Sequence, residues 1–413
     1  MYTSMFRKAM LGDTATLALD FTTGTMPSAV TFTRADSTAR ATYIDASGYV
    51  KTVASAGAAR FDYTGGVAKG LLIEAAATNI AVESDNFSTT NVDWVSNSYT
   101  SSFLSTSLPT GSTGNSRQIS IASGSGSFRS KTLTVTASTQ YTFSFWARNN
   151  GGSQARYRVW NVTAGSSIVD HTLSGSNYVS LIGGANNTSS TWVRISVTFT
   201  TPSGCTGIYI YPTSSDSGTV DLFVWGAQLE LGSQASSYIS TAGSQLTRLA
   251  DDAVIRSTAW TSLYSKPGSI VVEYYRGAYG AGDRSVLAID TAATKHIHLK
   301  HANASAASGI YNSAGTGVAT KATGNVSGLN KAAFTWSSAN PSVIKYALNG
   351  DATVVSATSD IGATLGTWMT IGSASTTGVS GSGTWEGYLN NSIKSIKYYS
   401  EVLSDADMIA KTT

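Results

Sequence analysis

The sequence is poor in several residue types, and each shortage excludes a class of protein. Cys205 is the single cysteine among 413 residues, so the chain has no intrachain disulfide framework and no zinc site made of cysteines. Charged residues make up only 12% of the chain, and the net charge is +3. Nucleic-acid binding needs clustered lysine and arginine to neutralise phosphates, and the sequence contains no such cluster. We therefore expect no nucleic-acid partner.

Long apolar runs are absent as well. No segment approaches the roughly 20 apolar residues that a transmembrane helix requires. Near the start of the sequence, Arg7 and Lys8 precede a short apolar stretch, but Gly12 interrupts it before it reaches the length of a secretion signal. The sequence therefore predicts a soluble protein that is neither inserted into a membrane nor secreted through a signal peptide.

The chain is rich instead in small, hydroxylated and aromatic residues, including 40 glycines and 20 tyrosines. Segments of aromatic and β-branched residues recur between turns of Gly, Ser and Asn, as is typical of antiparallel strands. In Tyr141–Ala147, aromatic residues alternate with small polar ones, which predicts a strand with one buried face. Strands at this spacing favour β-sandwiches, so we expect an all-β protein.

We expect three regions along the chain. Residues 1–80 hold short strand candidates separated by turns and cannot bury much apolar surface alone, so we interpret them as an irregular assembly or docking region. Residues 81–248 are predicted to form an antiparallel sandwich of the jelly-roll type. Residues 249–413 are predicted to form a second sandwich, which ends in a short helix over Glu401–Met408 with Ser404 as its cap.

The stretch Val220–Arg248 separates the two predicted sandwiches. It begins as a strand with one buried face and then breaks into Gly, Ser, Gln and Ala. Trp225 precedes Gly226, which predicts a large ring beside a residue without a side chain, where another ring or backbone can approach closely. Tyr238 and Ile239 are interpreted as an anchored crossover between the two β units.

Several phrases of the sequence resemble bacteriophage virion proteins of the tail-fibre-like or structural type. They are TFTRA at Thr31–Ala35, RFDY at Arg60–Tyr63, GLLIE at Gly70–Glu74, WGAQLE at Trp225–Glu230 and TR at Thr247–Arg248. The resemblance covers roughly the first 248 residues. It implies a fibre or spike that is assembled in the bacterial cytoplasm, released by lysis and located in the virion. It also implies contact with other virion proteins through the N-terminal region and a homo-oligomer, with a trimer favoured.

Each predicted sandwich has a resemblance of its own. FSFWAR at Phe143–Arg148 and TWVRISVTFT at Thr191–Thr200 resemble carbohydrate-binding-module-like jelly rolls. KAAFTW at Lys331–Trp336, YALNG at Tyr346–Gly350 and LSDAD at Leu403–Asp407 resemble the concanavalin A-like lectin and laminin-G fold. These resemblances imply two antiparallel sandwiches, a jelly roll and then a concanavalin A-like domain, of shapes that often bind sugars.

Glycan binding needs exposed aromatic rings that stack on sugar faces, together with a few fixed polar groups. The candidate glycan-binding residues of the second sandwich are Tyr274, Tyr279, His296, His298, Trp368 and Trp385. Tyr274 and Tyr275 are adjacent on a strand, so only one of them can line the core. Phe334 and Trp336 share a face, and both are assigned to the core. Tyr279 and Trp385 are favoured most as ligand contacts because they flank loops.

No metal or other cofactor is expected. His296 and His298 lie on one face of a predicted strand, a spacing that can present two metal ligands, with His301 just beyond. Carboxylates are few nearby, however, and a solvated strand face is the favoured interpretation. Calcium, which several lectin-like proteins use, would need clustered Asp and Asn oxygens, and those of this region are scattered along the sequence.

No catalytic residue is predicted, and we expect a binding protein instead of an enzyme. Retaining glycosidases need two carboxylates about 5 Å apart, but Glu273 and Glu386 each stand alone. The predicted function is attachment of a phage fibre or spike to a host-surface polysaccharide through multivalent non-covalent contacts. Two alternatives stay open: a purely structural decoration or connector protein of the particle, and a polysaccharide depolymerase.

Overall fold

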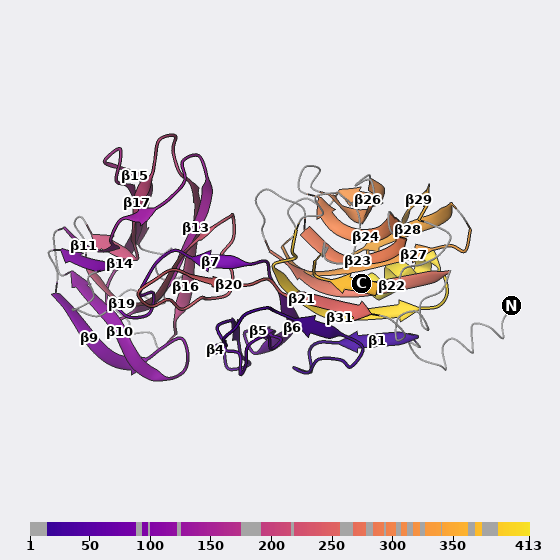
Figure 1. The fold of residues 1–413 in the computed structure, drawn as a ribbon, viewed down its shortest axis with the longest axis horizontal. Coiled ribbons are helices and arrows are strands. Elements are labelled where there is room, and N and C mark those ends of the chain that lie inside the picture. The colour runs from indigo at the N-terminus through magenta and orange to yellow at the C-terminus, as the bar shows by residue number, and fades with distance from the viewer. Residues whose placement is uncertain are drawn as a thin grey trace.

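The computed structural model describes residues 15–87, 93–97, 100–121, 125–174, 191–215, 219–256, 267–277, 284–292, 295–302, 307–311, 317–322, 327–339, 341–361, 368–373 and 387–413. These residues form antiparallel sheets, arranged as two β-sandwich lobes, and one short helix (Figure 1). The predicted all-β class with two antiparallel sandwiches is therefore confirmed.

The first lobe is the predicted jelly roll, drawn on the left in Figure 1. One side is a five-stranded sheet in the order β16 (Val193–Thr200), β13 (Gln140–Asn149), β19 (Val220–Leu231), β10 (Thr113–Ile121) and β9 (Thr100–Ser107). Facing it is a sheet of β12 (Leu133–Thr134), β17 (Gly207–Tyr211), β14 (Gln154–Asn161) and β15 (Ser166–Ser174). A further sheet contains β18 (Thr213–Ser215), β11 (Gly126–Ser130) and β8 (Trp94–Asn97). The core between them includes Phe143, Val159 and Leu222, all fully buried.

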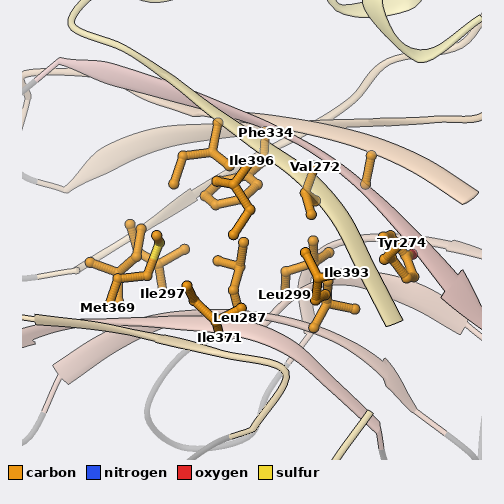
Figure 2. Close-up of a cluster of buried hydrophobic side chains, with 14 of the residues drawn as sticks. Val272, Tyr274, Leu287, Ile297, Leu299, Phe334, Met369, Ile371, Ile393 and Ile396 are labelled. Atoms are coloured by element: carbon orange, nitrogen blue, oxygen red, sulfur yellow. The ribbon is translucent and has the colours of Figure 1, made fainter. Parts of the chain in front are cut away.

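The second lobe is a larger sandwich of two sheets. The first has the order β29 (Val355–Ser359), β28 (Ser342–Leu348), β27 (Gly328–Trp336), β22 (Gly268–Arg276), β31 (Asn391–Tyr399), β6 (Val67–Ile73) and β5 (Phe61–Thr64), with β1 (Leu17–Asp20) also paired to β31. The second has the order β2 (Thr31–Thr33), β21 (Asp252–Arg256), β30 (Trp368–Ile371), β23 (Arg284–Ala292), β24 (Lys295–Ala302), β25 (Ala307–Tyr311) and β26 (Gly317–Ala322). Figure 2 shows Val272 and Ile396 of the first sheet across the core from Leu287 and Ile371 of the second.

Strands of the first eighty residues lie inside this second lobe. β1 and β6 both pair with β31, and Leu71 stands opposite Ile393 in the register. β2 pairs with β21 at the edge of the other sheet. Leu19, Phe21 and Ile73 are buried in the same core as the strands of residues 268–399. The second sandwich is therefore completed by strands that precede the jelly roll in sequence.

The remaining N-terminal strands connect the two lobes. β3 (Thr42–Ile44) and β4 (Val50–Thr52) form a hairpin whose Val50 packs with Trp146 and Tyr238, on the outer face of the five-stranded sheet. β7 (Ala77–Asn79) pairs with β20 (Leu246–Arg248) where the chain enters and leaves the jelly roll. Figure 1 shows β4, β5 and β6 next to the passage between the lobes.

The C-terminal helix α4 (Asp405–Thr412) begins where the sequence indicates. The Ser404 hydroxyl accepts a hydrogen bond from the Asp407 backbone N–H at 3.1 Å, so its predicted role as the cap is confirmed. Met408 is buried against Val271 and Ala333 on the outer face of the sheet. Among the described residues, no helix has the length and apolar character needed to cross a membrane.

Candidate functional site

A pocket of about 260 Å³ lies where the jelly roll, the N-terminal hairpin and the second sandwich meet. Its walls are the outer face of the five-stranded sheet, the β3–β4 hairpin, the crossover after β19 and the start of β31. The lining residues are Thr42, Tyr43, Ile44, Val50, Asp62, Lys69, Leu72, Glu74, Trp146, Arg194, Gln234, Ala235, Ser236, Ser237, Tyr238, Asn390 and Asn391. The pocket is smaller than most drug-sized ligand sites, which measure about 300–1,000 Å³. Its size suits a single sugar unit.

Aromatic rings form one wall of the pocket. The ring of Trp146 on β13 packs edge-on against Trp225 at 5.5 Å and against Tyr238 at 5.2 Å. Gly226 makes this arrangement possible, because a Cβ there would lie 2.8 Å from the Trp146 ring and its φ is +66°. The predicted close approach at Trp225–Gly226 is thus confirmed. Tyr43 adds a half-buried ring from the hairpin.

Charged groups stand beside these rings. The Arg194 guanidinium lies 4.6 Å from the centre of the Trp146 ring and donates to the Ser236 carbonyl at 2.7 Å. Burial lowers the pKa of Arg194. Across the pocket, Lys69 Nζ is 3.5 Å from the Asp62 carboxylate. Burial raises the pKa of Asp62, and the charge of Lys69 only partly offsets this effect.

Gln234 supplies an unused acceptor. Its amide nitrogen donates to the Asn390 carbonyl at 3.2 Å, which fixes the side chain between the lobes. Its amide oxygen is buried and has no hydrogen-bond partner among the described residues. A buried acceptor without a donor is unfavourable by about 1–3 kcal/mol, so this oxygen would gain from any donor that a small side-chain rotation lets it meet.

The pocket rests on a buried chain of alternating charges. Arg34 bonds to Asp36 at 2.8 Å and to Asp251 at 2.9 Å. Arg60 bonds to Asp251 and, at 2.6 Å, to Glu74.

Arg248 lies 3.4 Å from the same Glu74 carboxylate. The three arginines balance the three acids, and the side chains of all six residues are at most 5% exposed. We call this set the ionic junction.

Four of the six residues of the ionic junction lie in the phrases that resemble phage proteins. Arg34 comes from TFTRA, Arg60 from RFDY, Glu74 from GLLIE and Arg248 from TR. They are separated by up to 214 positions, from 34 to 248, and the fold brings them together. Sequence reasoning missed this cluster. A usable signal existed, since Glu74 directly follows the buried run Leu71–Ile73 in a chain with few charges.

The charge of Glu74 makes the stability of the junction depend on pH. Burial alone would raise the pKa of Glu74, but Arg248, Arg60 and hydrogen bonds from Ser237 lower it from 4.5 to about 2. A carboxylate with a lowered pKa stabilises the fold above its unfolded pKa, and this stabilisation is lost as the pH falls. We expect a loss on the order of 3 kcal/mol between about pH 4.5 and about pH 2.

Urea unfolding at a series of pH values measures this effect. Glu74→Gln has no carboxylate to protonate, so the stability of this variant should fall less over the same pH range than that of the unaltered protein. Parallel pH profiles for the two proteins would contradict the assignment, because other acids would then account for the whole pH dependence.

The structure places the predicted glycan-binding residues of the second sandwich apart from this pocket. Tyr274 is fully buried in the core of this sandwich (Figure 2). Its hydroxyl bonds to His301 Nε2 at 2.6 Å. His298 is also buried and bonds to the Ser285 hydroxyl at 2.8 Å. Both side chains are buried, so neither ring is accessible to a sugar. Tyr274 is the member of the Tyr274–Tyr275 pair that faces the opposite sheet.

The other candidates have different environments. Trp368 is half-buried on β30, with the Arg256 guanidinium 5.7 Å from its ring centre. Tyr279 and Trp385, and the side chain of His296, lie outside the described residues. Phe334 and Trp336 are both fully buried, as predicted.

The second sandwich also contains acids and histidines that could take part in catalysis or metal binding. Glu273 is paired with Lys394 at 3.2 Å, and Glu386 lies outside the described residues. The described part of the chain contains no cluster of three or more His, Cys, Asp or Glu side chains that could hold a metal ion. Burial, with the nearby charge of Arg276, lowers the pKa of His301 to about 3, so this ring is neutral at physiological pH.

Comparison with known proteins relates the first lobe to a family of binding domains. Residues 80–218 match the model of a family described as carbohydrate binding domain. Carbohydrate binding is therefore supported for the jelly roll. No curated protein matches the sequence significantly.

Three solved structures illustrate the similarities of the fold. The CBM40 of the Ruminococcus gnavus IT-sialidase has 21% identity and a TM-score of 0.27, over 36% of this chain and 83% of that one. The enzymatically active domain of tailspike protein 4 of bacteriophage CBA120 has 14% identity and a TM-score of 0.25, over 37% of this chain and 21% of that one. Domains LG4-5 of the mouse laminin α1 chain have 11% identity and a TM-score of 0.24, over 64% of this chain and 84% of that one.

Proposed function

We propose that the protein binds a carbohydrate in the pocket between the lobes. The observation that carries this proposal is the composition of the pocket wall. Trp146 and Arg194 belong to the sandwich that matches the carbohydrate binding domain family, and the same pocket is lined by Gln234, whose amide oxygen has no partner among the described residues. Trp146 is largely covered, so the half-buried Tyr43 is the ring of the pocket that can stack on the apolar face of a sugar, and amide and charged groups bond to sugar hydroxyls. A pocket of this size accepts the terminal unit of a glycan.

The test uses the full chain, since strands from residues 17–73 complete the second sandwich. Binding of purified protein to an array of neutral glycans is measured for the unaltered protein and for Tyr43→Ala and Gln234→Ala. We expect each variant to bind about tenfold more weakly, because each removes a ligand contact worth about 1–2 kcal/mol.

Tyr49→Ala is the matched control. Tyr49 is a tyrosine of the same hairpin, 39% exposed, and it does not line the pocket. Its replacement should leave the affinity unchanged. Equal binding by Tyr43→Ala, Gln234→Ala and the control would overturn the placement of the site, and no binding of any glycan by the unaltered protein would overturn the proposal itself.

We further propose that the protein is a fibre or spike of a bacteriophage particle that attaches to a host-surface polysaccharide. Four of the six residues of the ionic junction come from the phrases that resemble phage virion proteins, and the junction joins the N-terminal segments to the residues that follow the jelly roll. Such a junction suits a protein whose N-terminal region is held firmly in a larger particle. Several copies in one particle, as in a homotrimer, would raise the avidity of weak sugar sites.

Phage particles that carry the pocket variants test this role. If Gln234→Ala particles assemble normally but adsorb poorly to host cells, attachment is supported. If they adsorb normally, the protein is a structural connector of the particle, a role that the buried ionic junction would also suit.

The proposed action is binding without cleavage. Asp62 and Glu74 both line the pocket, but Glu74 is engaged by Arg60 and Arg248. Incubation with host polysaccharide should therefore release no new reducing ends. Their release, and its loss in Asp62→Asn, would show a depolymerase instead.

A further inference from the structure

A second surface of the jelly roll combines aromatic rings with arginines. It lies on the outer face of the sheet formed by β12, β17, β14 and β15, in the lobe drawn on the left in Figure 1. Ala155 and Val159 of β14 point into the core, as do Ile208 and Ile210 of β17. Side chains alternate between the faces of a strand, so the intervening residues stand on the outside. They are the half-buried Trp160 and Tyr209, the buried Tyr211 and the arginines Arg156 and Arg158.

The register places these side chains next to one another. Trp160 stands opposite Tyr209, and Arg158 stands opposite Tyr211. The Arg158 guanidinium lies 5.1 Å from the Trp160 ring centre and 5.6 Å from that of Tyr211. Arg129 on β11 lies 3.9 Å from the Tyr209 ring centre. Rings and guanidinium groups thus form one continuous surface, which we call the arginine–aromatic face.

Fixed contacts hold the arginines of this face in place. Asp170 on β15 bonds to Arg156 through both carboxylate oxygens at 2.6 Å and lies 3.3 Å from Arg158 Nε. Arg158 also donates to the Ser167 hydroxyl at 3.1 Å. A guanidinium carries five N–H donors, so both Arg158 and Arg129 keep donors for a ligand. The side chains of Arg156 and Arg158 are 15% and 18% exposed, so the ligand would meet them in a partly desolvated site.

The charge of the arginine–aromatic face is unbalanced. Among the described residues of the face, the guanidinium groups of Arg129, Arg156 and Arg158 outnumber the carboxylate of Asp170, which contacts Arg156 and Arg158. The ionic junction, in contrast, balances its three arginines with three acids. Because an excess of fixed positive charge attracts anions, the face has a charge complementary to an acidic ligand.

We propose that the arginine–aromatic face is a second glycan site and that it binds sugars carrying a carboxylate. The half-buried Trp160 ring offers an apolar surface to the face of a sugar ring. A guanidinium matches the two oxygens of a carboxylate with two parallel N–H donors. An open sheet face accepts the middle of a chain, whereas the pocket accepts an end. The inference rests on the proposed carbohydrate binding only for the class of ligand, and its residues are separate from those of the pocket.

Calorimetry on the full chain tests the site with two acidic probes, hexagalacturonate and an α2,8-linked tetrasialate. The methyl ester of hexagalacturonate is the neutral control. We expect at least one of the two acids to bind. If hexagalacturonate binds, its methyl ester should bind about tenfold more weakly. Raising the salt concentration should weaken binding of the acid, because charge attraction between exposed groups is screened.

Variants then locate the binding. Arg129→Gln, Arg158→Gln and Trp160→Ala should each weaken binding of the acid by about tenfold, as expected for loss of a charge-assisted or stacking contact. Arg256→Gln is the matched control, since Arg256 also lies over a tryptophan, 5.7 Å from the Trp368 ring centre, but in the other sandwich. Its affinity should not change. Circular dichroism and thermal melting confirm that each variant is folded.

Three results would overturn the proposal: neither acid binds, the control variant loses as much affinity as Arg129→Gln and Arg158→Gln, or binding is the same for hexagalacturonate and its ester. Neutral-glycan binding by the pocket is measured on the same proteins. If it is retained while both acids fail to bind, this second site alone is refuted. If the unaltered protein binds neither neutral nor acidic glycans, both proposals fail.

Discussion

Replacing Arg60 with alanine is expected to lower the free energy of unfolding by about 3–5 kcal/mol. Arg60 is fully buried, and its guanidinium bonds to Glu74 and to Asp251. Its removal leaves two carboxylates inside the protein with fewer positive partners, and a buried charge without a partner is strongly destabilising. Urea unfolding at pH 7 measures the difference.

Two comparisons make the Arg60 prediction specific. Arg60→Lys should lower the free energy of unfolding less than Arg60→Ala does, because lysine keeps the positive charge. Some loss should remain, since an ammonium group lacks the planar guanidinium geometry that bonds two carboxylates at once. Arg256→Ala is the exposed control: its side chain is 49% exposed and lies 4.0 Å from Asp252, so its loss should amount to about 0–1 kcal/mol. If Arg60→Ala were no more harmful than Arg256→Ala, the ionic junction would contribute nothing to stability.

Gly70→Ala is expected to be about as destabilising, for a steric reason. Gly70 lies on β6, next to the residues of that strand that pair with β31, and its φ is +100°. A Cβ at this position would lie 2.1 Å from the Ile393 carbonyl oxygen, so the backbone of one strand must move. Strain at such a φ costs about 1–3 kcal/mol, and overpacking adds about 1–3 kcal/mol more. Thermal or urea unfolding of the full chain measures the sum.

Gly48→Ala separates the two contributions. Gly48 has a similar φ of +82°, but a Cβ there would have no heavy atom within 4 Å. This control should therefore show the conformational strain alone. A loss for Gly70→Ala that merely equals that of Gly48→Ala would mean that β6 and β31 can separate at little cost. It would then contradict the close packing of the N-terminal strands on the second sandwich.

Local features of the fold were predictable because neighbouring residues determine them. Ser404 caps α4 through a hydrogen bond to a backbone N–H three residues later, an interaction encoded within one turn. The alternation of Lys331–Trp336 correctly assigned Phe334 and Trp336 to the core. At Tyr274–Tyr275 the same alternation showed that one ring faces inward, but not which one, since that depends on the sheet that covers the strand.

The pocket was not predictable for a related reason. Tyr43, Trp146 and Gln234 come from three distant segments. FSFWAR, which contains Trp146, resembles carbohydrate-binding-module-like jelly rolls, but it does not indicate which side chains of other segments meet it in a pocket. The sequence directed attention to aromatic residues of the second sandwich. Two of those, Tyr279 and Trp385, lie outside the described residues, so their predicted role stays a prediction.

By itself the sequence determined the all-β class, the strand faces, the C-terminal cap and the close ring contact at Gly226, because backbone geometry and short-range sterics fix these features. Only the tertiary structure decided which strands share a sheet and which charges meet. Strands pair through backbone N–H and C=O groups, which nearly every residue has. The residues of β1 therefore do not specify β31 as the strand with which β1 pairs. The partners of Arg60 lie 14 and 191 positions away, and only the closed fold brings them together, out of contact with water.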